Sequence, residues 1–159
     1  MISCQFEDGN KASLRHVTVD TVVFNSEKTQ ILLVLRAMRL LEGGKWGVVG
    51  GYMDRDETME QAARREIYEE TGYELESIDF QYFNDNPDRP GEDRQNVSFI
   101  FTAVAGKQTG IPDDESSEIH WFDIDKLPDK SKIAFDHAEI IKNCLDGMLK
   151  NRQIGAYET

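Results

Sequence analysis

The sequence predicts an α/β fold in which helices pack on a central mixed β-sheet. Six segments have the apolar and β-branched content of strands, two have the residue spacing of helices, and the helices fall between or after the strands. Elements in this order form a sheet that is covered by helices. Hydrophobic residues make up 39% of the 159 residues, which is enough for a buried core and argues against intrinsic disorder. At this length we expect one domain, residues 1–159.

The expected strands are short runs of apolar and β-branched residues. The run ILLVLR is continuously apolar, which suits a central strand that is buried on both faces. The run WGVVGGYM is expected to be a short strand that breaks at Gly50-Gly51. Residues 1–14 are polar and are expected to be irregular or to form an edge element. The full set of expected strands is 16–24, 31–36, 46–53, 73–83, 96–105 and 118–124.

Two segments are expected to be helices. In the first, Thr58 is followed three residues later by Gln61, which is the pattern of a capping box at a helix start. This helix is expected to end at Gly72, because glycine readily adopts the left-handed backbone conformation that stops a helix. The second helix, residues 135–152, has apolar residues at helical spacing. A short helical turn is expected at residues 123–128.

Two long polar loops flank the strand that begins at Asn96. Residues 84–95 and residues 106–118 are rich in Pro, Gly, Asn, Asp and Ser, which is typical of loops. Connections of about a dozen residues are long for a compact domain and carry function more often than short ones do. We therefore expect both loops to contribute to recognition of a ligand.

The chain is strongly acidic, with a formal net charge of −12. This balance disfavours nucleic-acid binding, because a protein that neutralises phosphates needs a basic surface. It is compatible with binding of divalent cations. It is also compatible with a phosphorylated small molecule, if a metal and a few local Arg or Lys residues reverse the local field. Solubility alone would explain the charge as well.

The sequence indicates a soluble protein of the reducing cytoplasm with no membrane partner. No apolar run approaches the length of a membrane span, and the N-terminus MISCQFEDGNK lacks the apolar core of a signal peptide. Cys4 and Cys144 are far apart and lack the spacing of a zinc site or a disulfide framework.

The first helix ends in a cluster of three carboxylates. Glu66, Glu69 and Glu70 lie within about one turn, although like charges at this spacing repel and negative charge opposes the helix dipole at this end. At 100° per residue, Glu66 and Glu70 share the small apolar packing stripe of the helix, and Glu69 lies on its shoulder. Carboxylates at a partly buried edge are costly unless a cation compensates them, and Mg²⁺ takes carboxylate oxygens. The pattern favours a metal site over the alternative, a solvated charged face.

The Gly50-Gly51 pair lies between the preceding strand and this helix. Glycine lets the backbone approach a ligand closely, so a carbonyl or N–H group here would face the same site. An ordinary turn explains the dipeptide equally well.

The segment GYMDRDETMEQAARREIYEETGY resembles the Nudix box, Gly-x5-Glu-x7-Arg-Glu-U-x-Glu-Glu-x-Gly-U, where U is a bulky apolar residue. So many fixed positions make the signal specific. Tyr73 departs from the aliphatic preference, and Val49 stands where the family usually has Pro. The flanking strands and the Trp121-Phe122 segment extend the likeness to about residues 16–150. The matching residues are Gly51, Glu57, Arg65, Glu66, Ile67, Glu69, Glu70 and Gly72.

The resemblance implies an α/β/α sandwich around a mixed sheet, and metal-dependent hydrolysis of a nucleoside diphosphate linked to another moiety. The implied cofactor is Mg²⁺ or Mn²⁺, which would activate water and neutralise charge on the phosphates. Glu69 and Arg65 are implied as catalytic residues, with Arg65 orienting the carboxylates through charged hydrogen bonds. The implied metal ligands are Glu66, Glu69, Glu70 and the carbonyl of Gly50, with Glu57 and Gly51 in support.

A general base outside the box is common in the family, on a loop before the Trp-containing strand. That loop is IPDDESSEIHWF in this chain. Glu115 is the first candidate for the base and Glu118 is the second, while Asp113 and Asp114 are lesser competitors. The alternative is a solvated acidic loop.

The box does not set the substrate. Residues 86–103 and 133–141 look like segments of ADP-ribose pyrophosphatase-like members of the family, which favours ADP-ribose or another nucleoside diphosphate sugar. Arg36 and Arg39, which follow the second strand, are candidates for phosphate binding, with a surface charge as the alternative reading. Aromatic residues on strands are more often core than base-stacking groups. The candidates for base stacking are Trp46, Tyr82 and Phe83.

Two other functions stay open. A nucleoside triphosphate pyrophosphohydrolase would release a nucleoside monophosphate and pyrophosphate, whereas ADP-ribose would give AMP and ribose phosphate. A non-catalytic nucleotide sensor usually carries a DNA-binding domain, and this chain has no basic segment for one. The intact carboxylate set also favours catalysis. The expected partner is a small-molecule nucleotide, and the resemblance is compatible with a homodimer.

Overall fold

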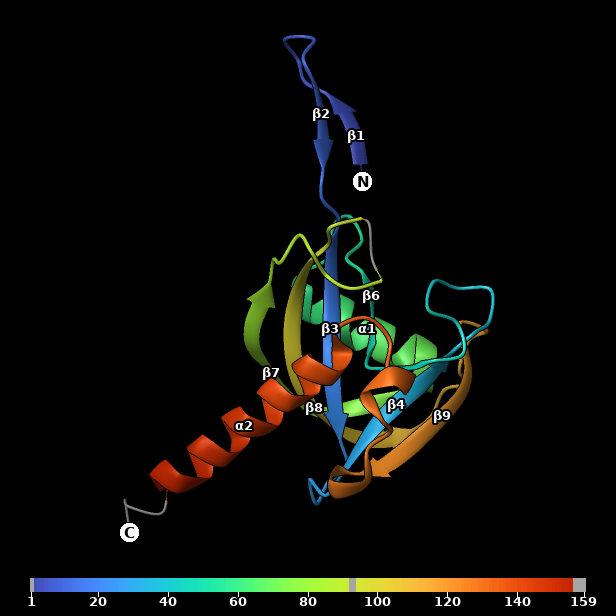
Figure 1. The fold of residues 1–159 in the computed structure, drawn as a ribbon, viewed down its shortest axis with the longest axis vertical. Helices are drawn as coiled ribbons and strands as arrows, with labels where there is room; N and C mark the ends of the chain where they lie inside the picture. The colour runs from blue at the N-terminus through green and yellow to red at the C-terminus, as the bar shows by residue number, and fades with distance from the viewer. Residues whose placement is uncertain (1, 92–93, 156–159) are drawn as a thin grey trace.

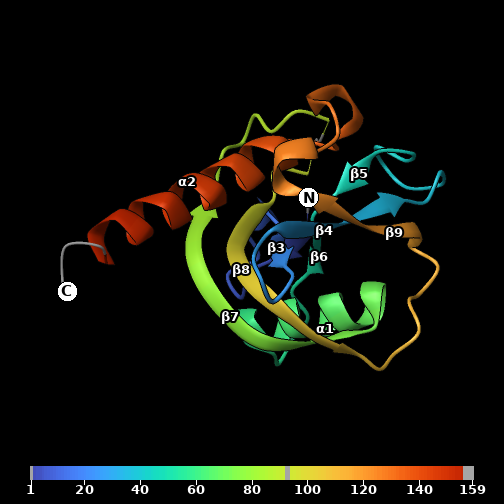
Figure 2. The ribbon, with the colours of Figure 1, turned by 90° about the horizontal axis from the view of Figure 1, so that it is seen from below.

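The computed structural model describes residues 2–91 and 94–155. Its centre is a seven-stranded mixed sheet. Helix α1 (Met59–Thr71) covers one face of the sheet and helix α2 (His137–Gly155) lies against the other, as Figure 2 shows. The expected α/β/α sandwich is therefore confirmed.

Strand β3 (Val17–Phe24) is the centre of the sheet. It pairs in parallel with β8 (Val97–Gln108), in a register that runs from Val17 opposite Val97 to Phe24 opposite Val104. Its other edge pairs antiparallel with two strands, β6 near its start and β4 near its end. Strand β4 (Gln30–Arg36) pairs with β5 (Trp46–Gly47) and with β9 (Ser116–Asp123). Strand β7 (Tyr73–Asn84) pairs with β8, and the bounds of β6 are Val49–Tyr52.

The expected break at Gly50-Gly51 is wrong, because the strand breaks at Val48 and β6 runs through both glycines. The glycines serve close approach instead. A Cβ atom on Gly50 would lie 2.1 Å from the carbonyl oxygen of Val19, and one on Gly51 would lie 2.5 Å from the carboxylate of Glu66. Only glycine lets β6 lie this close to both β3 and α1.

Helix α1 has the predicted ends. Thr58 and Gln61 form both hydrogen bonds of the capping box, and Gly72 adopts the left-handed conformation with φ 71°. The helix buries Ala62, Ala63 and other residues against the sheet, where they pack with Val19 and neighbouring side chains. Its buried face also includes Glu70, so the packing stripe does end in a carboxylate.

The C-terminal helix begins later than expected, at His137 instead of Phe135. Phe135 has a φ of 51°, which is left-handed and therefore ends the preceding segment rather than starting a helix. Ile140, Ile141 and Cys144 pack into the core on this face of the sheet. The expected helical turn is a 3₁₀ turn, η1 (Ile124–Lys126), and a second one, η2 (Lys130–Lys132), follows.

The N-terminal residues form a hairpin that stands apart from the sheet. Strands β1 (Ile2–Gln5) and β2 (Lys11–Leu14) pair with each other as a separate two-stranded sheet and project from the body of the molecule in Figure 1. The register places Ile2 opposite Leu14 and Cys4 opposite Ala12, so these four apolar side chains share one face. In the part of the chain that is described, no helix has the length and apolarity needed to cross a membrane.

Candidate active site

A cavity of about 420 Å³ opens beside the C-terminal half of α1. Eight of the residues singled out from the sequence line it, and they come from β4, β6, α1 and the loop before β9. These residues are Arg36, Gly50, Gly51, Arg65, Glu66, Glu69, Asp113 and Glu115. Glu57 and Glu70 lie behind this lining, where they contact residues that belong to it.

Arg65 is the centre of a charged network on the helix. Its guanidinium donates hydrogen bonds to Glu57 at 2.7 and 3.1 Å, to Glu66 at 2.7 Å, and to Glu69 at 3.0 Å. It also donates to the backbone carbonyl of Tyr52 at 2.9 Å. The hydrogen bonds to Glu57 and the other carboxylates raise the pKa of Arg65, and the bond from Arg65 lowers the pKa of Glu57. Arg65 is therefore hydrogen-bonded to three acidic residues of the motif.

Glu70 is the buried carboxylate of the cluster, with 7% of its surface exposed. Burial raises its pKa to about 8, although two donors favour the ionised form. These donors are the Ser116 hydroxyl, at 3.0 Å, and the backbone N–H of Gly50, at 3.3 Å. An ionised Glu70 is thus under-compensated by the protein alone.

Glu66 is half-buried and lies against β6 where Gly51 leaves room for its carboxylate. Burial also raises the pKa of Glu66, and the hydrogen bond from Arg65 opposes the shift. Glu69 has a side chain that is 49% exposed and reaches solvent, as its place on the shoulder of the stripe predicts. The three glutamates of α1 thus range from the buried Glu70 behind the lining to the exposed Glu69 in it.

These residues fit a hard divalent cation in their chemistry. Carboxylate oxygens next to a close-approaching glycine backbone are the donors that Mg²⁺ and Mn²⁺ prefer, and the raised pKa values of Glu66 and Glu70 show carboxylates that a cation would stabilise. Within residues 2–91 and 94–155, no group of three or more His, Cys, Asp or Glu side chains already converges on one cation position. Arg65 bonds to both Glu66 and Glu69 and takes up oxygens that a cation would need.

The loop before β9 contributes some of its predicted residues to the cavity and not others. Glu115 and Asp113 line the cavity, and the N–H of Asp113 donates to the carbonyl of Glu69 at 2.8 Å. Glu118 is exposed on β9, opposite Leu35, and is not part of the lining. Asp114 forms an exposed ion pair at 3.0 Å with Arg39, which does not line the cavity either.

Arg36 does line the cavity, at the end of β4 where a bulge interrupts pairing with β9. Its Nε donates to the carbonyl of Leu41 at 2.9 Å, and its guanidinium carbon lies 5.1 Å from the ring centroid of Phe135. Burial lowers the pKa of Arg36, and nearby Glu70 opposes this shift. The sequence therefore identified one cavity arginine, Arg36, and one exposed arginine, Arg39.

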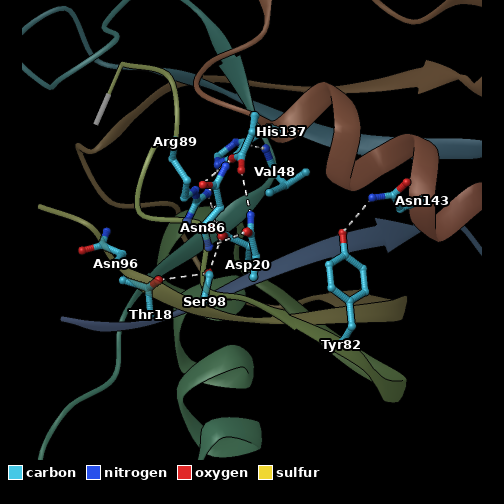
Figure 3. A network of polar contacts seen from close by, with 12 residues as sticks. Thr18, Asp20, Val48, Tyr82, Asn86, Arg89, Asn96, Ser98, His137 and Asn143 are labelled. Atoms are coloured by element: carbon cyan, nitrogen blue, oxygen red, sulfur yellow. Dashed lines mark hydrogen bonds and ion pairs between the residues drawn. The ribbon is translucent and has the colours of Figure 1, made fainter. Parts of the chain in front are cut away.

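A second charged network, drawn in Figure 3, contributes buried residues such as Asp20, Arg89 and His137 to the cavity lining. Arg89, from the β7–β8 loop, bonds to Asp136 at 2.7 Å and reaches Asp20 of β3 at 3.5 Å. Asp20 also accepts a hydrogen bond from Ser98, and His137 lies 3.7 Å away. Burial opposes ionisation of Asp136, but the hydrogen bonds from Arg89 hold its pKa below the usual range.

His137 is a buried, neutral member of this network. The N–H of Val48 donates to its Nδ1 at 3.1 Å, so that nitrogen carries no proton. Burial lowers the pKa of His137, which keeps the ring uncharged near neutral pH. The sequence assigned no role to the histidines, and this contact between α2 and β5–β6 could not be read from spacing.

The aromatic residues named as base-stacking candidates do not line the cavity. Trp46 packs edge-on against Phe122 in the core, 5.0 Å between centroids. Tyr82 borders a separate hollow of about 250 Å³, and Phe83 is exposed on β7. The aromatic residues of the main cavity are instead Tyr52 and Phe135.

Comparison with known proteins identifies the family of the chain. The NUDIX domain model matches residues 14–144, which include the carboxylate helix and both sides of the cavity. The chain belongs to the Nudix hydrolase family. The helix with Glu66, Glu69 and Glu70 is thus the Nudix helix, and divalent metal ions are generally used by hydrolases of this family.

Individual Nudix relatives point to different substrates. An ADP-ribose pyrophosphatase of Methanocaldococcus jannaschii is 34% identical over 128 residues, covering 80% of this chain and 71% of that protein. An oxidized purine nucleoside triphosphate hydrolase of Danio rerio is 35% identical over 122 residues, covering 67% of this chain and 72% of its own. The NUDIX domain of Shewanella oneidensis NrtR, solved with ADP ribose, has a TM-score of 0.71 and 25% identity, covering 86% of this chain and 90% of that domain.

Other matches are less complete. The chain spans 38% of one curated relative and 64% of one solved Nudix structure. What those longer proteins do as a whole does not transfer from this likeness.

The sequence missed the residues of the inner network, and it missed Arg94, which also lines the cavity. Asp20 was the detectable signal, because a charged residue in an otherwise apolar central strand needs a partner or a function. Arg89 and Arg94 lie in a loop whose composition predicts only a loop, so nothing local marks them. Tyr52 sits inside the Nudix box at a position that the motif leaves free.

Proposed function

We propose that this Nudix protein hydrolyses the phosphoanhydride bond of a nucleoside diphosphate linked to another moiety, with ADP-ribose or a related nucleoside diphosphate sugar as substrate. The observation that carries the proposal is a cluster of three glutamates at one cavity: Glu66 and Glu69 line it and bond to Arg65, and Glu70 lies behind them on Gly50 and Ser116. The named activity of the M. jannaschii relative and the ADP ribose bound to the S. oneidensis domain support the substrate class.

The carboxylates and the backbone carbonyl of Gly50 would hold Mg²⁺ or Mn²⁺. When bound, such a cation neutralises phosphate charge and lowers the pKa of water. Arg65 orients Glu66 and Glu69, with Glu57 as its anchor. Gly51 gives Glu66 its place beside β6. Water adds to one phosphorus, the bridging P–O bond breaks, and ADP-ribose yields AMP and ribose phosphate.

We assign the general base to Glu115. Of the two glutamates considered on this loop, Glu115 lines the cavity and Glu118 does not. Asp113 shares the lining and is the competitor, although its carboxylate already accepts the N–H of Glu115 at 2.9 Å. The rate of hydrolysis is expected to fall in Glu115→Gln. Its pH profile is expected to lose the acidic limb, in which the rate rises as the general base loses its proton. Glu118→Gln is expected to match the wild type in both respects.

The central test is hydrolysis of ADP-ribose with Mg²⁺ or Mn²⁺, followed by identification of AMP and ribose phosphate. Glu69→Gln and Glu70→Gln are expected to lower kcat/KM at least about 100-fold, because each removes a charged ligand. The matched control is Glu60→Gln on the same helix, since Glu60 is exposed, pairs with Arg64 at 2.9 Å and is outside the cavity lining. Unchanged activity in both glutamine variants would contradict the mechanism.

A nucleoside triphosphate pyrophosphohydrolase is the second candidate, favoured by the 35% identity to the D. rerio enzyme. The same assay with oxidised purine triphosphates separates the two, since that reaction releases pyrophosphate. The third candidate is a non-catalytic nucleotide sensor, and tight ADP-ribose binding without turnover in any divalent metal would favour it. The complete set of box carboxylates favours catalysis.

We also infer one domain over residues 1–159, with its core at about residues 16–150, a cytoplasmic location and a homodimer. Cys4 and Cys144 are free thiols, as is usual in a reducing compartment.

The apolar face of the β1–β2 hairpin, which includes Ile2 and Leu14 at 44% and 43% exposure, would be covered by a second copy in the homodimer. Light scattering of the full chain and of a chain lacking residues 2–14 tests this. The same number of subunits in both proteins would refute a hairpin-mediated dimer.

A further inference from the structure

The cavity that contains the glutamates also contains cationic side chains, although the chain as a whole has a net charge of −12. Arg36 lies at the end of β4, and Arg94 lies in the segment before β8. Each guanidinium is held over an aromatic ring, with its carbon 5.1 Å from the Phe135 centroid for Arg36 and 5.5 Å from the Tyr52 centroid for Arg94. Both cations are therefore positioned in advance of any ligand.

Arg36 presents an open fork to the cavity. Its Nε is used by the carbonyl of Leu41, but among residues 2–91 and 94–155 neither of its terminal nitrogens has a hydrogen bond or an ion pair. Half-buried guanidinium nitrogens normally find an acceptor, and two parallel N–H groups match a phosphate or a carboxylate. The missing acceptor is thus expected to come from a bound anion.

Arg94 is close enough to Arg36 to act on it. Burial is the main factor that lowers the pKa of Arg36; the negative charge of Glu70 opposes this shift, and the positive charge of Arg94 adds to it. Two like charges on one cavity repel, and an anion bound between them would turn this repulsion into attraction. The arrangement therefore disfavours a neutral ligand and favours a phosphate.

Tyr52 connects this cationic part of the cavity to the glutamates. Its hydroxyl accepts a hydrogen bond from Arg94 Nη1, while its backbone carbonyl accepts one from Arg65 Nη2 at 2.9 Å. Its own place is set by β6, where Tyr52 pairs with Thr18 of the central strand. One residue thus contacts both the arginine that orients the carboxylates and an arginine of the basic pair.

We propose that Arg36 and Arg94 form a two-armed clamp for one phosphate of the bridging diphosphate, with Tyr52 as the positioning residue for Arg94. The clamp rests on the proposed function, in which the glutamate cluster serves the other phosphate. A diphosphate bridge places two anionic groups in adjacent positions, and the cavity offers one charged group of residues for each. Substrates with a single phosphate would engage only one of the two.

The first test measures binding without metal or turnover. Calorimetric titration with inorganic pyrophosphate in EDTA is expected to show about tenfold or greater weakening in Arg36→Ala and in Arg94→Ala. Arg94→Lys keeps the charge but loses the fork and the stacking, so an intermediate value is expected. The charge-matched control is Arg55→Ala, because Arg55 is 93% exposed and lies outside the cavity lining.

The second test separates positioning from folding. With ADP-ribose and Mg²⁺, Arg94→Ala is expected to raise KM about tenfold and to change kcat less, as expected when binding in the ground state is lost. Tyr52→Phe keeps the ring and loses the hydroxyl, and Tyr52→Leu loses both, so the KM should rise in that order. Thermal unfolding by circular dichroism shows whether each variant is folded. If a Tyr52 variant is unfolded, the KM of Arg94→Lys is used instead to test the loss of the fork and the stacking.

The outcomes distinguish the clamp from the substrate. Absence of pyrophosphate binding to the wild type, or equal binding by Arg94→Ala, overturns the clamp even if ADP-ribose is hydrolysed normally. Weakened pyrophosphate binding by Arg94→Ala supports the clamp even in a protein that cleaves no nucleoside diphosphate sugar, and in that case the proposed substrate alone is wrong.

Discussion

Two arginine–carboxylate networks meet at the same cavity, and they differ in how completely they are closed. Arg65 joins Glu57, Glu66 and Glu69 on α1, where side chains such as Glu69 reach solvent. Arg89 joins Asp20 and Asp136 with side-chain exposures of 4%, 11% and 13%, so water has little access to them. The contacts are similar, but the first network includes a carboxylate, Glu69, whose side chain is 49% exposed, and an arginine that is 28% exposed.

The difference indicates a division of labour between chemistry and architecture. The Arg89 network joins three separate parts of the chain, namely β3, the β7–β8 loop and the start of α2. The Arg65 network lies on one helix and the strand–loop segment just before it. We therefore expect damage to the Arg89 network to appear mainly in stability, and damage to the Arg65 network mainly in activity.

The largest effect is expected from Arg89→Ala. Removal of one partner from a buried ion pair leaves charge without compensation and typically costs about 3–5 kcal/mol. Urea unfolding should show this loss in the free energy of unfolding. The control is Arg64→Ala, whose ion pair with Glu60 is exposed, and its unfolding free energy should fall by less than about 1 kcal/mol. A loss for Arg89→Ala as small as that of the control would break the comparison.

Arg65→Ala is expected to lower kcat/KM by about 10- to 100-fold, as is typical when a residue that orients metal-binding groups is lost. Its unfolding free energy should fall less than that of Arg89→Ala, because the carboxylates it leaves behind can be hydrated. Arg65→Lys retains the charge without the fork and should lie between the two in activity. Unfolding of Arg65→Ala under conditions where Arg89→Ala stays folded would reverse the assignment.

A smaller effect is expected from pH, through Glu70. The pKa of Glu70 is raised by burial from 4.5 to about 8, so the folded chain keeps a proton in this range that the unfolded chain has lost. The stabilisation is fully present below about pH 4.5 and is lost as pH rises through about 8. In EDTA, the wild type should therefore lose up to about 1.4 kcal/mol per pH unit relative to Glu70→Gln. Parallel pH profiles for the two proteins would show that Glu70 titrates normally.

The smallest effects come from a matched pair of serines. Ser98 donates to Asp20 in the Arg89 network, and Ser116 donates to Glu70 behind the lining of the glutamate site. Ser98→Ala should lower the unfolding free energy by about 1 kcal/mol or more and leave KM unchanged. Ser116→Ala removes a bond that lowers the pKa of Glu70, so it should raise the Mn²⁺ concentration needed for half-maximal activity. Identical metal titrations for both variants would argue against the distinction.

Local chemistry explains which parts were predictable from the sequence. The ends of α1 follow from Thr58, Gln61 and Gly72, whose effects act within one turn, and they were confirmed. The stripe that carries Glu66 and Glu70 follows from helix periodicity alone. Strand existence was equally accessible, because β-branched and apolar runs mark strands wherever they lie.

Long-range contacts explain what was missed. Asp20, Arg89 and Asp136 are brought together by the tertiary fold, so no local pattern signals their network. The sequence drew attention to Gly50 and Gly51, but glycine is the expected residue both where a strand breaks and where the backbone lies close to a neighbour. Only the neighbours, Val19 and Glu66, decide between them.

The parallel pairing of β3 with β8 has a consequence for synthesis of the chain. Val17 pairs with Val97, which is synthesised 80 residues later, so the edge of β3 that pairs with β8 stays unpaired until then. At ~5–20 residues per second, this interval lasts about 4–16 s on the ribosome. During it, the Nudix helix is already complete but lacks part of the sheet on which it packs, and one edge of β3 stays open. A nascent chain with an open, apolar strand edge is prone to pair with its neighbours on a polysome, so expression at lower temperature or with a holding chaperone should raise the yield of folded enzyme.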